Sequence, residues 1–380
     1  MANIKKQKEV FKIKKIKYII FLLVLILIVG IFVYFYFNKK TNFNNSITEV
    51  ANVENIDNSF KENQNTVGSN TIIENGSNKD STTPVGKHGK LSVNGLKIVD
   101  KNGSTFSLKG VSTHGIAWFP QYVNKEAFQT MRDSWGINVV RLAMYSDPNA
   151  GYSTSIHEKV KEGVKYATDL GLYVIIDWHI LNDGNPNTYK TQAISFFNEM
   201  TNLYKDYDNI IYEICNEPNG NVTWQNDIKP YAEDVIREIR NVDKDAIILC
   251  GTPTWSQDVD VVANDPIEGY KNIMYTLHFY ADTHRDNIRN KAQIALNKNL
   301  PIFVSEFGIC DASGNGNINE DEANKWIEFL NNNNISWVCW NLSNKNESSA
   351  LLTPENSKIS GWTIDDLSRE GKWLLDVLKK

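Results

Sequence analysis

Cysteine is scarce in this chain. Four of the 380 residues are cysteines, Cys215, Cys250, Cys310 and Cys339. They lie far apart, without the close pairs that zinc sites and disulfide frameworks show. We therefore expect them to be small side chains that pack in the protein core.

Basic residues are outnumbered by acidic ones over most of the chain, and tryptophan is absent from its N-terminal part. Residues 1–40 contain nine Lys and one Glu, so residues 41–380 carry 31 basic against 44 acidic residues, a net charge of −13. This balance argues against a nucleic-acid-binding protein. All ten tryptophans lie at or after Trp118, so we expect the core and the ligand site in the C-terminal three quarters. A content of 41% hydrophobic residues excludes a chain disordered throughout.

Residues 18–37 form one uncharged run that is long enough to cross a membrane as a helix. Seven lysines precede this run and two follow it, so the positive-inside rule places the N-terminus in the cytoplasm and the rest of the chain outside the cell. A cleaved signal peptide, and hence a secreted protein, is the alternative. The run exceeds a usual signal core, however, and ends without a small-x-small cleavage site. We expect an uncleaved anchor.

Residues 41–80 contain eleven asparagines and no tryptophan or tyrosine. Such a segment cannot bury enough apolar surface to offset its ordering entropy. The expected organisation is therefore a cytoplasmic basic segment at 1–17, a transmembrane anchor helix at 18–37, a flexible linker at 38–88 and a folded domain at 89–380.

Residues 89–380 alternate short apolar runs with longer amphipathic stretches, such as residues 155–170 and 230–242. Eight runs are predicted strands, at residues 106–112, 137–143, 172–178, 210–215, 246–250, 273–279, 301–307 and 335–340. This pattern predicts an α/β protein with a single (β/α)8 TIM barrel after the anchor helix and the linker. An open doubly wound sheet is the alternative, but no Gly-x-Gly-x-x-Gly motif opens a helix after the first strand.

Polar side chains stand at the C-terminal ends of these strands, where the active site of such a barrel lies. Two of them are carboxylates, Glu217 at the end of strand four and Glu306 at the end of strand seven. Glycosidic bond hydrolysis needs such a pair, an acid that protonates the leaving oxygen and an ionised carboxylate across the sugar. Each Glu could merely pair with a base, but together with Arg141, His278 and Tyr280 a catalytic pair is favoured.

Seven motifs occur in order along this part of the chain. They are Lys-Gly-Val-Ser-Thr-His-Gly-Ile-Ala-Trp-Phe-Pro (109–120), Asn-Val-Val-Arg-Leu-Ala-Met-Tyr (138–145), Val-Ile-Ile-Asp-Trp-His (174–179), Tyr-Glu-Ile-Cys-Asn-Glu-Pro-Asn (212–219), Thr-Leu-His-Phe-Tyr-Ala (276–281), Pro-Ile-Phe-Val-Ser-Glu-Phe-Gly (301–308) and Trp-Asn-Leu-Ser-Asn-Lys-Asn-Glu-Ser-Ser-Ala-Leu (340–351). With them, residues 89–380 resemble glycoside hydrolase family 5 in its bacterial endo-β-1,4-glucanase branch.

The resemblance implies a role for each matching residue. Glu217 would be the acid/base, with its pKa raised by the charge of Glu306, and Glu306 the nucleophile of a retaining mechanism. Arg141 and Tyr280 would hold Glu306 ionised, and Asn216 would bind the 2-hydroxyl of the sugar being cleaved. The expected sugar-binding residues are His179, His278 and Trp340 at the cleavage point, His114, Trp118, Tyr145, Lys345 and Glu347 for neighbouring glucose units, and Trp255 on the leaving-group side.

The resemblance implies a cellulase that needs no cofactor, with cellulose or a related β-1,4-glucan as substrate, and we expect a monomer. The same scaffold acting on mannan, xylan or mixed-linkage glucan is one alternative. A catalytically silent cell-surface polysaccharide-binding module is another, although both Glu and all their expected partners are present. Cys310 stands next to the expected mouth, where it would be placed to touch substrate.

Residues 311–322 fit the register of an EF-hand calcium loop, with Asp311 at position 1, Gly316 at position 6, Ile318 at position 8 and Glu322 at position 12. The loop follows a predicted strand and not a helix, and the family that the chain resembles has a similar loop without requiring calcium. We therefore expect no metal site here.

Overall fold

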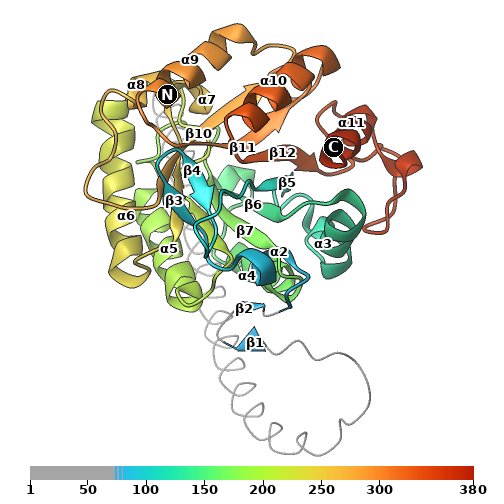
Figure 1. Cartoon of the computed structure of the whole chain (residues 1–380), viewed down its shortest axis with the longest axis horizontal. Coiled ribbons are helices and arrows are strands. Elements are labelled where there is room, and N and C mark those ends of the chain that lie inside the picture. Colours follow the sequence, from blue (N-terminus) through green and yellow to red (C-terminus); the bar gives the residue numbers. More distant parts are fainter. Residues whose placement is uncertain (1–72, 75–76, 79) are drawn as a thin grey trace, which may run out of the picture. The chain divides into compact units, whose positions relative to one another are not determined.

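A closed barrel of parallel strands forms the centre of the folded unit in the computed structural model, which describes residues 73–74, 77–78 and 80–380 (Figure 1). Each strand pairs with the next along the chain, and β12 closes the ring onto β5. The barrel strands are β5 (Lys109–Thr113), β6 (Val139–Tyr145), β7 (Tyr173–His179), β8 (Ile210–Glu213), β9 (Ile247–Cys250), β10 (Ile273–Tyr280), β11 (Ile302–Gly308) and β12 (Trp337–Leu342). The predicted (β/α)8 barrel is confirmed, with every strand within three residues of its expected start.

Helices surround the barrel on its outside (Figure 1). They are α3 (Lys125–Thr130), α4 (Ile156–Asp169), α5 (Lys190–Tyr204), α6 (Lys229–Val242), α7 (Pro253–Ser256), α8 (Val259–Val262), α9 (Asp286–Asn297), α10 (Glu320–Asn332) and α11 (Arg369–Leu378). The amphipathic pattern explains their packing: α4 buries Val160 and Val164, and α6 buries Val235 and Ile239, toward the strands. The two helices predicted at 155–170 and 230–242 are confirmed.

The N-terminal end of the barrel is closed by a short helix and a hairpin. Helix α2 (Pro84–His88) and the hairpin of β3 (Ser92–Asn94) and β4 (Lys97–Val99) bury Val85 and Ile98 in one apolar cluster with Val139 and Ile175 of the barrel. The backbone N–H of Val85 also donates to the carbonyl of Gly171 at 2.9 Å. Residues 84–88, which the composition assigned to the linker, thus pack on the barrel, because Val85 supplies an apolar contact that their polar surroundings conceal.

The other N-terminal expectations fall largely outside the described residues. These are the basic segment at 1–17, the anchor helix at 18–37 and most of the linker at 38–88. Within the linker, the structure describes the two-residue strands β1 (Ile73–Glu74) and β2 (Ser77–Asn78), which pair antiparallel. Among the described residues, no helix combines the length and the apolar character that crossing a membrane demands.

Candidate active site

A cleft of about 620 Å³ lies at the C-terminal ends of the barrel strands. Eleven of the predicted site residues line it: His114, Tyr145, His179, Glu217, Trp255, His278, Tyr280, Glu306, Trp340, Lys345 and Glu347. Arg141 and Asn216 have no exposed surface and lie among the residues around Glu306 and His179. Trp118 is 47% exposed and stacks on Tyr145, with ring centroids 4.9 Å apart. The structure therefore brings the whole predicted set to one site.

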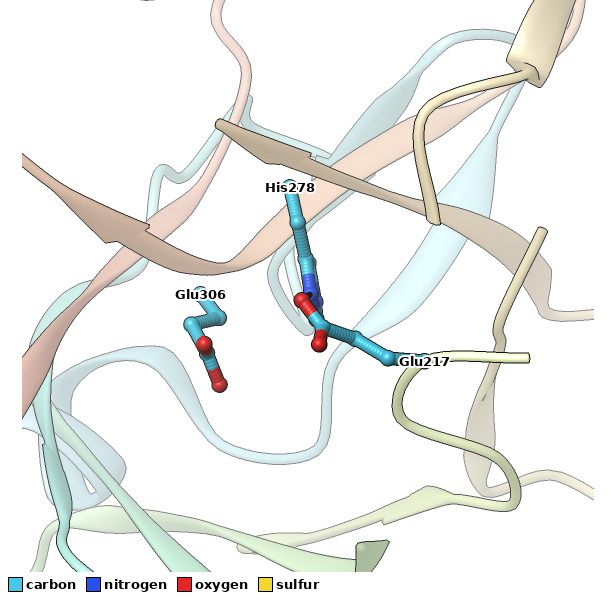
Figure 2. A group of neighbouring side chains, drawn as sticks. All are labelled: Glu217, His278 and Glu306. Atoms are coloured by element: carbon cyan, nitrogen blue, oxygen red, sulfur yellow. Dashed lines mark hydrogen bonds and ion pairs between the residues drawn. The ribbon is translucent and has the colours of Figure 1, made fainter. Parts of the chain in front are cut away.

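Glu217 and Glu306 face the same space (Figure 2). Glu217 stands in the loop after β8 and Glu306 on β11, and one carboxylate oxygen of each lies within 4.8 Å of the other. His278 of β10 lies beside Glu217, with Nδ1 2.9 Å from Glu217 Oε1. These three residues could offer ligand atoms to a cation, but His278 Nδ1 is engaged by Glu217, and the pair has the geometry of an acid and a nucleophile.

Glu306 is held by two donors, one on each oxygen. The Tyr280 hydroxyl donates to Oε1 at 2.8 Å, and Arg141 Nη1 donates to Oε2 at 3.1 Å. Burial raises the pKa of Glu306, as does the charge of Glu217, whereas His278 and Arg141 oppose the shift. The Glu217 contribution vanishes once Glu217 is protonated, so the ionised form of Glu306 is favoured when the proton resides on Glu217.

Glu217 is only 7% exposed, and burial raises its pKa to about 8. Arg141 lowers the pKa of Glu217, while the carboxylates of Asp177 and Glu213 raise it further. Burial is the largest cause of this shift, and the two carboxylates add to it. The charge of Glu306 acts in the same direction, as expected, because the coupling between Glu217 and Glu306 is reciprocal.

A single buried cation binds several carboxylates beneath the cleft. Arg141 donates to Glu213 from Nε and Nη2 at 2.7 and 3.0 Å, and its Nη2 lies 3.0 Å from Asp177 Oδ2. Burial alone would lower the pKa of Arg141, but Asp177, Glu213 and Glu306 raise it. One positive charge cannot neutralise these three carboxylates and Glu217 together, which favours keeping a proton on Glu217.

Sequence reasoning gave no site role to Asp177 or Glu213. Both occupy strand positions without exposed surface, inside apolar runs. A charged residue within a buried strand is the signal that could have marked them, since such a group must find a partner. Asp177 also accepts a hydrogen bond from His179 Nδ1 at 2.7 Å, which leaves His179 Nε2 to accept from Asn216 at 3.3 Å.

Aromatic rings line part of the cleft that holds the two carboxylates. Trp340 stacks on His179, with ring centroids 5.2 Å apart and 15° between the planes, and its ring also contacts His114. Lys345 and Glu347 pair at 2.6 Å next to this wall. A flat apolar ring beside paired polar groups suits a sugar, which offers both a C–H face and hydroxyl groups.

Trp255 lies in a left-handed turn, and this turn also fixes the backbone around Glu217. Thr254, Trp255 and Ser256 have φ angles of 57°, 54° and 56°, so α7 is not helical throughout. The N–H of Trp255 donates to the carbonyl of Pro218 at 3.0 Å, and the Ser256 hydroxyl donates to that of Asn216 at 2.6 Å. The carbonyls on both sides of Glu217 are therefore held by this turn. The residue types at positions 254–256 did not predict this turn.

Two remaining sequence expectations concern the cysteines and the loop 311–322. The four cysteines are all buried and free, as expected; Cys310 packs with Tyr145 and Trp340 and does not line the cleft. In the loop 311–322, Glu322 belongs to α10 and pairs with Arg289 at 2.5 Å and Lys325 at 3.1 Å. The carboxylate that an EF-hand would direct at calcium is thus already neutralised.

Known proteins resemble this chain over the same region. The family model of cellulase, glycosyl hydrolase family 5, matches residues 99–346. An endoglucanase of Clostridium saccharobutylicum is 51% identical over 77% of this chain and 65% of its own length. Endoglucanase A of Butyrivibrio fibrisolvens is 50% identical over 77% of this chain and 69% of its own length. The chain thus spans about two thirds of the length of these relatives.

Solved structures agree with the sequence comparisons. The catalytic domain of Thermobifida fusca endoglucanase Cel5A, in complex with cellotetraose, superposes with a TM-score of 0.73 at 34% identity, over 78% of this chain and all of that chain. The cellulase Cel5C_n superposes with a TM-score of 0.75 at 44% identity, over 78% of this chain and 94% of that chain. The family model matches well over half of the residues of this chain, the two endoglucanases are about 50% identical to it in sequence, and solved cellulase structures superpose on it. The chain therefore belongs to glycosyl hydrolase family 5.

Proposed function

We propose that the chain is a retaining endo-β-1,4-glucanase, a cellulase that cuts internal bonds of a β-1,4-linked glucan. The separation of the two carboxylates carries the proposal. Retaining enzymes hold their carboxyl groups about 5–5.5 Å apart and inverting enzymes about 6.5–9.5 Å apart. Oxygens of Glu217 and Glu306 within 4.8 Å fit the retaining class, and the space is too short for a water molecule and a sugar ring to stand between them.

The first half-reaction uses the two carboxyl groups in different protonation states. Glu306, ionised and oriented by Tyr280 and Arg141, attacks the anomeric carbon of the bound sugar. As the glycosidic bond breaks, Glu217 transfers its proton to the leaving oxygen. The first product departs with that proton, and the remaining glucan is an ester of Glu306.

The second half-reaction reverses these roles. Glu217, now ionised, takes a proton from a water molecule, and the resulting nucleophile attacks the anomeric carbon of the ester. Glu306 leaves as a carboxylate, and Glu217 is protonated for the next cycle. Two inversions at the same carbon restore the original β configuration.

The cleft supports a glucan chain as substrate because it offers apolar faces beside the carboxylates. Trp340 and Trp255 both line it, and Trp255 is 44% exposed. The endoglucanases that this chain resembles support β-1,4-glucan in preference to mannan or xylan. Mixed-linkage glucan, mannan and xylan are the alternative substrates, and a silent binding module would have no use for the paired carboxylates.

We also propose that residues 18–37 anchor the chain in the cell membrane, with the N-terminus in the cytoplasm and the catalytic domain outside. The uncharged run of twenty residues and the seven lysines before it support this arrangement. Cell fractionation tests it, followed by protease treatment of intact cells. Catalytic fragments released from a membrane-bound chain are expected, whereas a soluble, shortened chain in the medium would favour signal cleavage.

The activity is tested with the purified chain on carboxymethylcellulose, mixed-linkage glucan, xylan and mannan, while viscosity and reducing ends are followed in parallel. We expect a fast fall in viscosity with few reducing ends on the first two polymers. Activity restricted to mannan or xylan would move the substrate and retain the mechanism. Binding without turnover on all four polymers would indicate a sugar-binding module.

A further inference from the structure

A line of hydrogen bonds connects Glu217 to groups behind the cleft that the mechanism does not use. His278 Nδ1 lies 2.9 Å from Glu217 Oε1, and His278 Nε2 lies 2.9 Å from the Ser305 hydroxyl oxygen. The Ser305 hydroxyl lies 2.8 Å from Glu213 Oε1. Ser305 and Glu213 have no exposed surface and do not line the cleft.

An irregularity of β11 makes this arrangement possible. In the pairing of β11 with β10, Phe303 lies opposite Thr276 and Glu306 lies opposite His278. Between these two pairs the chain advances three residues on β11 but only two on β10. The pairing with β12 has the same extra residue. Such a bulge turns consecutive residues to one side, which explains how Ser305 and Glu306 both bond to groups inside the barrel.

The donors along this line can be assigned in one way. Arg141 donates to both oxygens of Glu213, so Glu213 is an acceptor there. The Ser305 hydroxyl has one hydrogen and gives it to Glu213. It can then only accept from His278, so His278 carries a hydrogen on Nε2. Burial lowers the pKa of His278 to about 4, so the neutral ring has a bare lone pair on Nδ1.

We propose that Ser305, held by Glu213, fixes the tautomer of His278 so that Glu217 bonds to His278 only as a protonated acid. Ser305 and Glu213 are then positioning residues for the acid/base, a role that rests on the proposed function. His278 Nδ1 has no hydrogen to donate, so the contact at 2.9 Å is a hydrogen bond only when Glu217 donates.

The same contact serves both halves of the reaction. When Glu217 gives its proton to the leaving oxygen, its carboxylate is left facing the Nδ1 lone pair without a donor between them. That repulsion raises the basicity of Glu217 for the second half, in which it takes a proton from water and the hydrogen bond to His278 forms again. No net proton enters or leaves the line behind His278.

The other charged and titratable groups around Glu217 remain in place when only the Ser305 hydroxyl is removed. They come from each neighbouring strand: Arg141 of β6, Asp177 and His179 of β7, Glu213 of β8, His278 and Tyr280 of β10 and Glu306 of β11. Ser305→Ala therefore tests the hydrogen bond alone. Ser305→Thr keeps the hydroxyl and is the conservative variant.

The test compares the pH profiles of kcat/KM on a β-glucan with those on an aryl cellobioside whose dinitrophenolate leaving group needs no protonation. For Ser305→Ala we expect the basic limb on the glucan to move to lower pH by about one unit, the size of one hydrogen bond. The kcat/KM of the aryl cellobioside, which reports the glycosylation step alone, should stay near the wild-type level. Ser305→Thr should keep the wild-type limb on both substrates.

Ser336→Ala is the matched control, since it removes another buried hydroxyl, which accepts from the N–H of Leu108 at 2.9 Å far from the cleft. It should lower stability without moving the limb. The tautomer itself is read in the wild-type chain by nitrogen NMR of labelled histidine, with His278→Gln to assign the signal, so the test survives a variant that fails to fold.

A hydrogen on Nδ1 of His278 in the active wild-type chain would overturn the proposal, as would an unmoved basic limb in a folded Ser305→Ala variant. These outcomes are distinct from failure of the proposed function, in which the wild-type chain itself would turn over neither substrate.

Discussion

Tyr280 donates its hydroxyl hydrogen to Glu306 at 2.8 Å from the neighbouring strand. Burial keeps the pKa of Tyr280 well above its ordinary value, so this phenol stays a donor at every working pH. The contact holds one oxygen of the nucleophile, while Arg141 holds the other.

We predict that Tyr280→Phe lowers kcat by roughly 10- to 100-fold, with a smaller change in KM. A hydrogen bond to a charged group contributes about 1.5–3 kcal/mol, and here it orients the attacking carboxylate. Steady-state kinetics on a soluble β-glucan measure the effect. A rise in KM with unchanged kcat would instead make Tyr280 a sugar-binding residue.

Replacing Glu306 or Glu217 by glutamine is predicted to affect enzyme activity in different ways. Glu306→Gln should abolish turnover of every substrate, because the nucleophile is lost. Glu217→Gln should keep the glycosylation step on substrates with activated leaving groups, which need no proton. Pre-steady-state kinetics on polymer and aryl cellobioside separate the two cases. Equal loss on both kinds of substrate for Glu217→Gln would refute the assignment of the acid.

The pH profile of the wild-type chain should show the proton of Glu217 directly. Because burial raises the pKa of Glu217 to about 8, its acid form prevails below that pH, and kcat/KM on β-glucan should fall above it. The profile for an aryl cellobioside with an activated leaving group should lack this fall in the glycosylation step. A basic limb common to both substrates would assign the titration to another group.

A second buried acid affects stability rather than turnover. Glu370 of α11 has no exposed surface, accepts from the N–H of Ile309 at 3.1 Å, and has its pKa raised by burial to about 8. In the unfolded chain its pKa is about 4.3. The folded state therefore retains a proton that the unfolded state loses, and stability falls as pH rises from about 4.3 through about 8.

Glu370→Gln cannot ionise and should escape this loss, which amounts to as much as about 1.4 kcal/mol per pH unit. We expect the Tm of the variant, relative to wild type, to increase with pH over this range. Glu217 also has a raised pKa, but it is present in both chains and cancels in the comparison. A Tm difference that does not change with pH would show that Glu370 is ionised or already exposed.

Chelation should leave the melting temperature unchanged. Glu322 pairs with Arg289 and Lys325, and Asp311 accepts from the N–H of Ser313 at 2.8 Å, so the acidic groups at the first and last positions of the loop 311–322 have partners within the protein. A fall in Tm with EDTA that calcium restores would identify a metal site in this loop.

The sequence predicted the barrel because its signals are local. Parallel strands buried on both faces appear as continuous apolar runs, and their polar C-terminal ends marked Glu217, Glu306 and Arg141. The strand boundaries differ from those expected: residues 106–108 extend the apolar run before β5 but lie outside the strand, and β8 ends at Glu213 and not at residue 215. Hydrogen bonding to neighbouring strands, which a single run does not reveal, decides where each strand ends.

The features that escaped prediction depend on contacts between distant residues. The charge balance around Arg141 requires knowing that Asp177 and Glu213 point at the same guanidinium. The left-handed turn at Trp255 carries no glycine to mark it. The bulge in β11 that brings Ser305 against His278 is visible only in the register of paired strands.

The most direct measurement is mass spectrometry of the peptide that carries Glu306, after reaction with an activated cellobioside that bears fluorine in place of the 2-hydroxyl. This substitution slows the second half-reaction, so the sugar ester should accumulate. The account predicts one cellobiosyl adduct, located on Glu306, and products that keep the β configuration. An adduct on Glu217, or products of inverted configuration without any adduct, would contradict it.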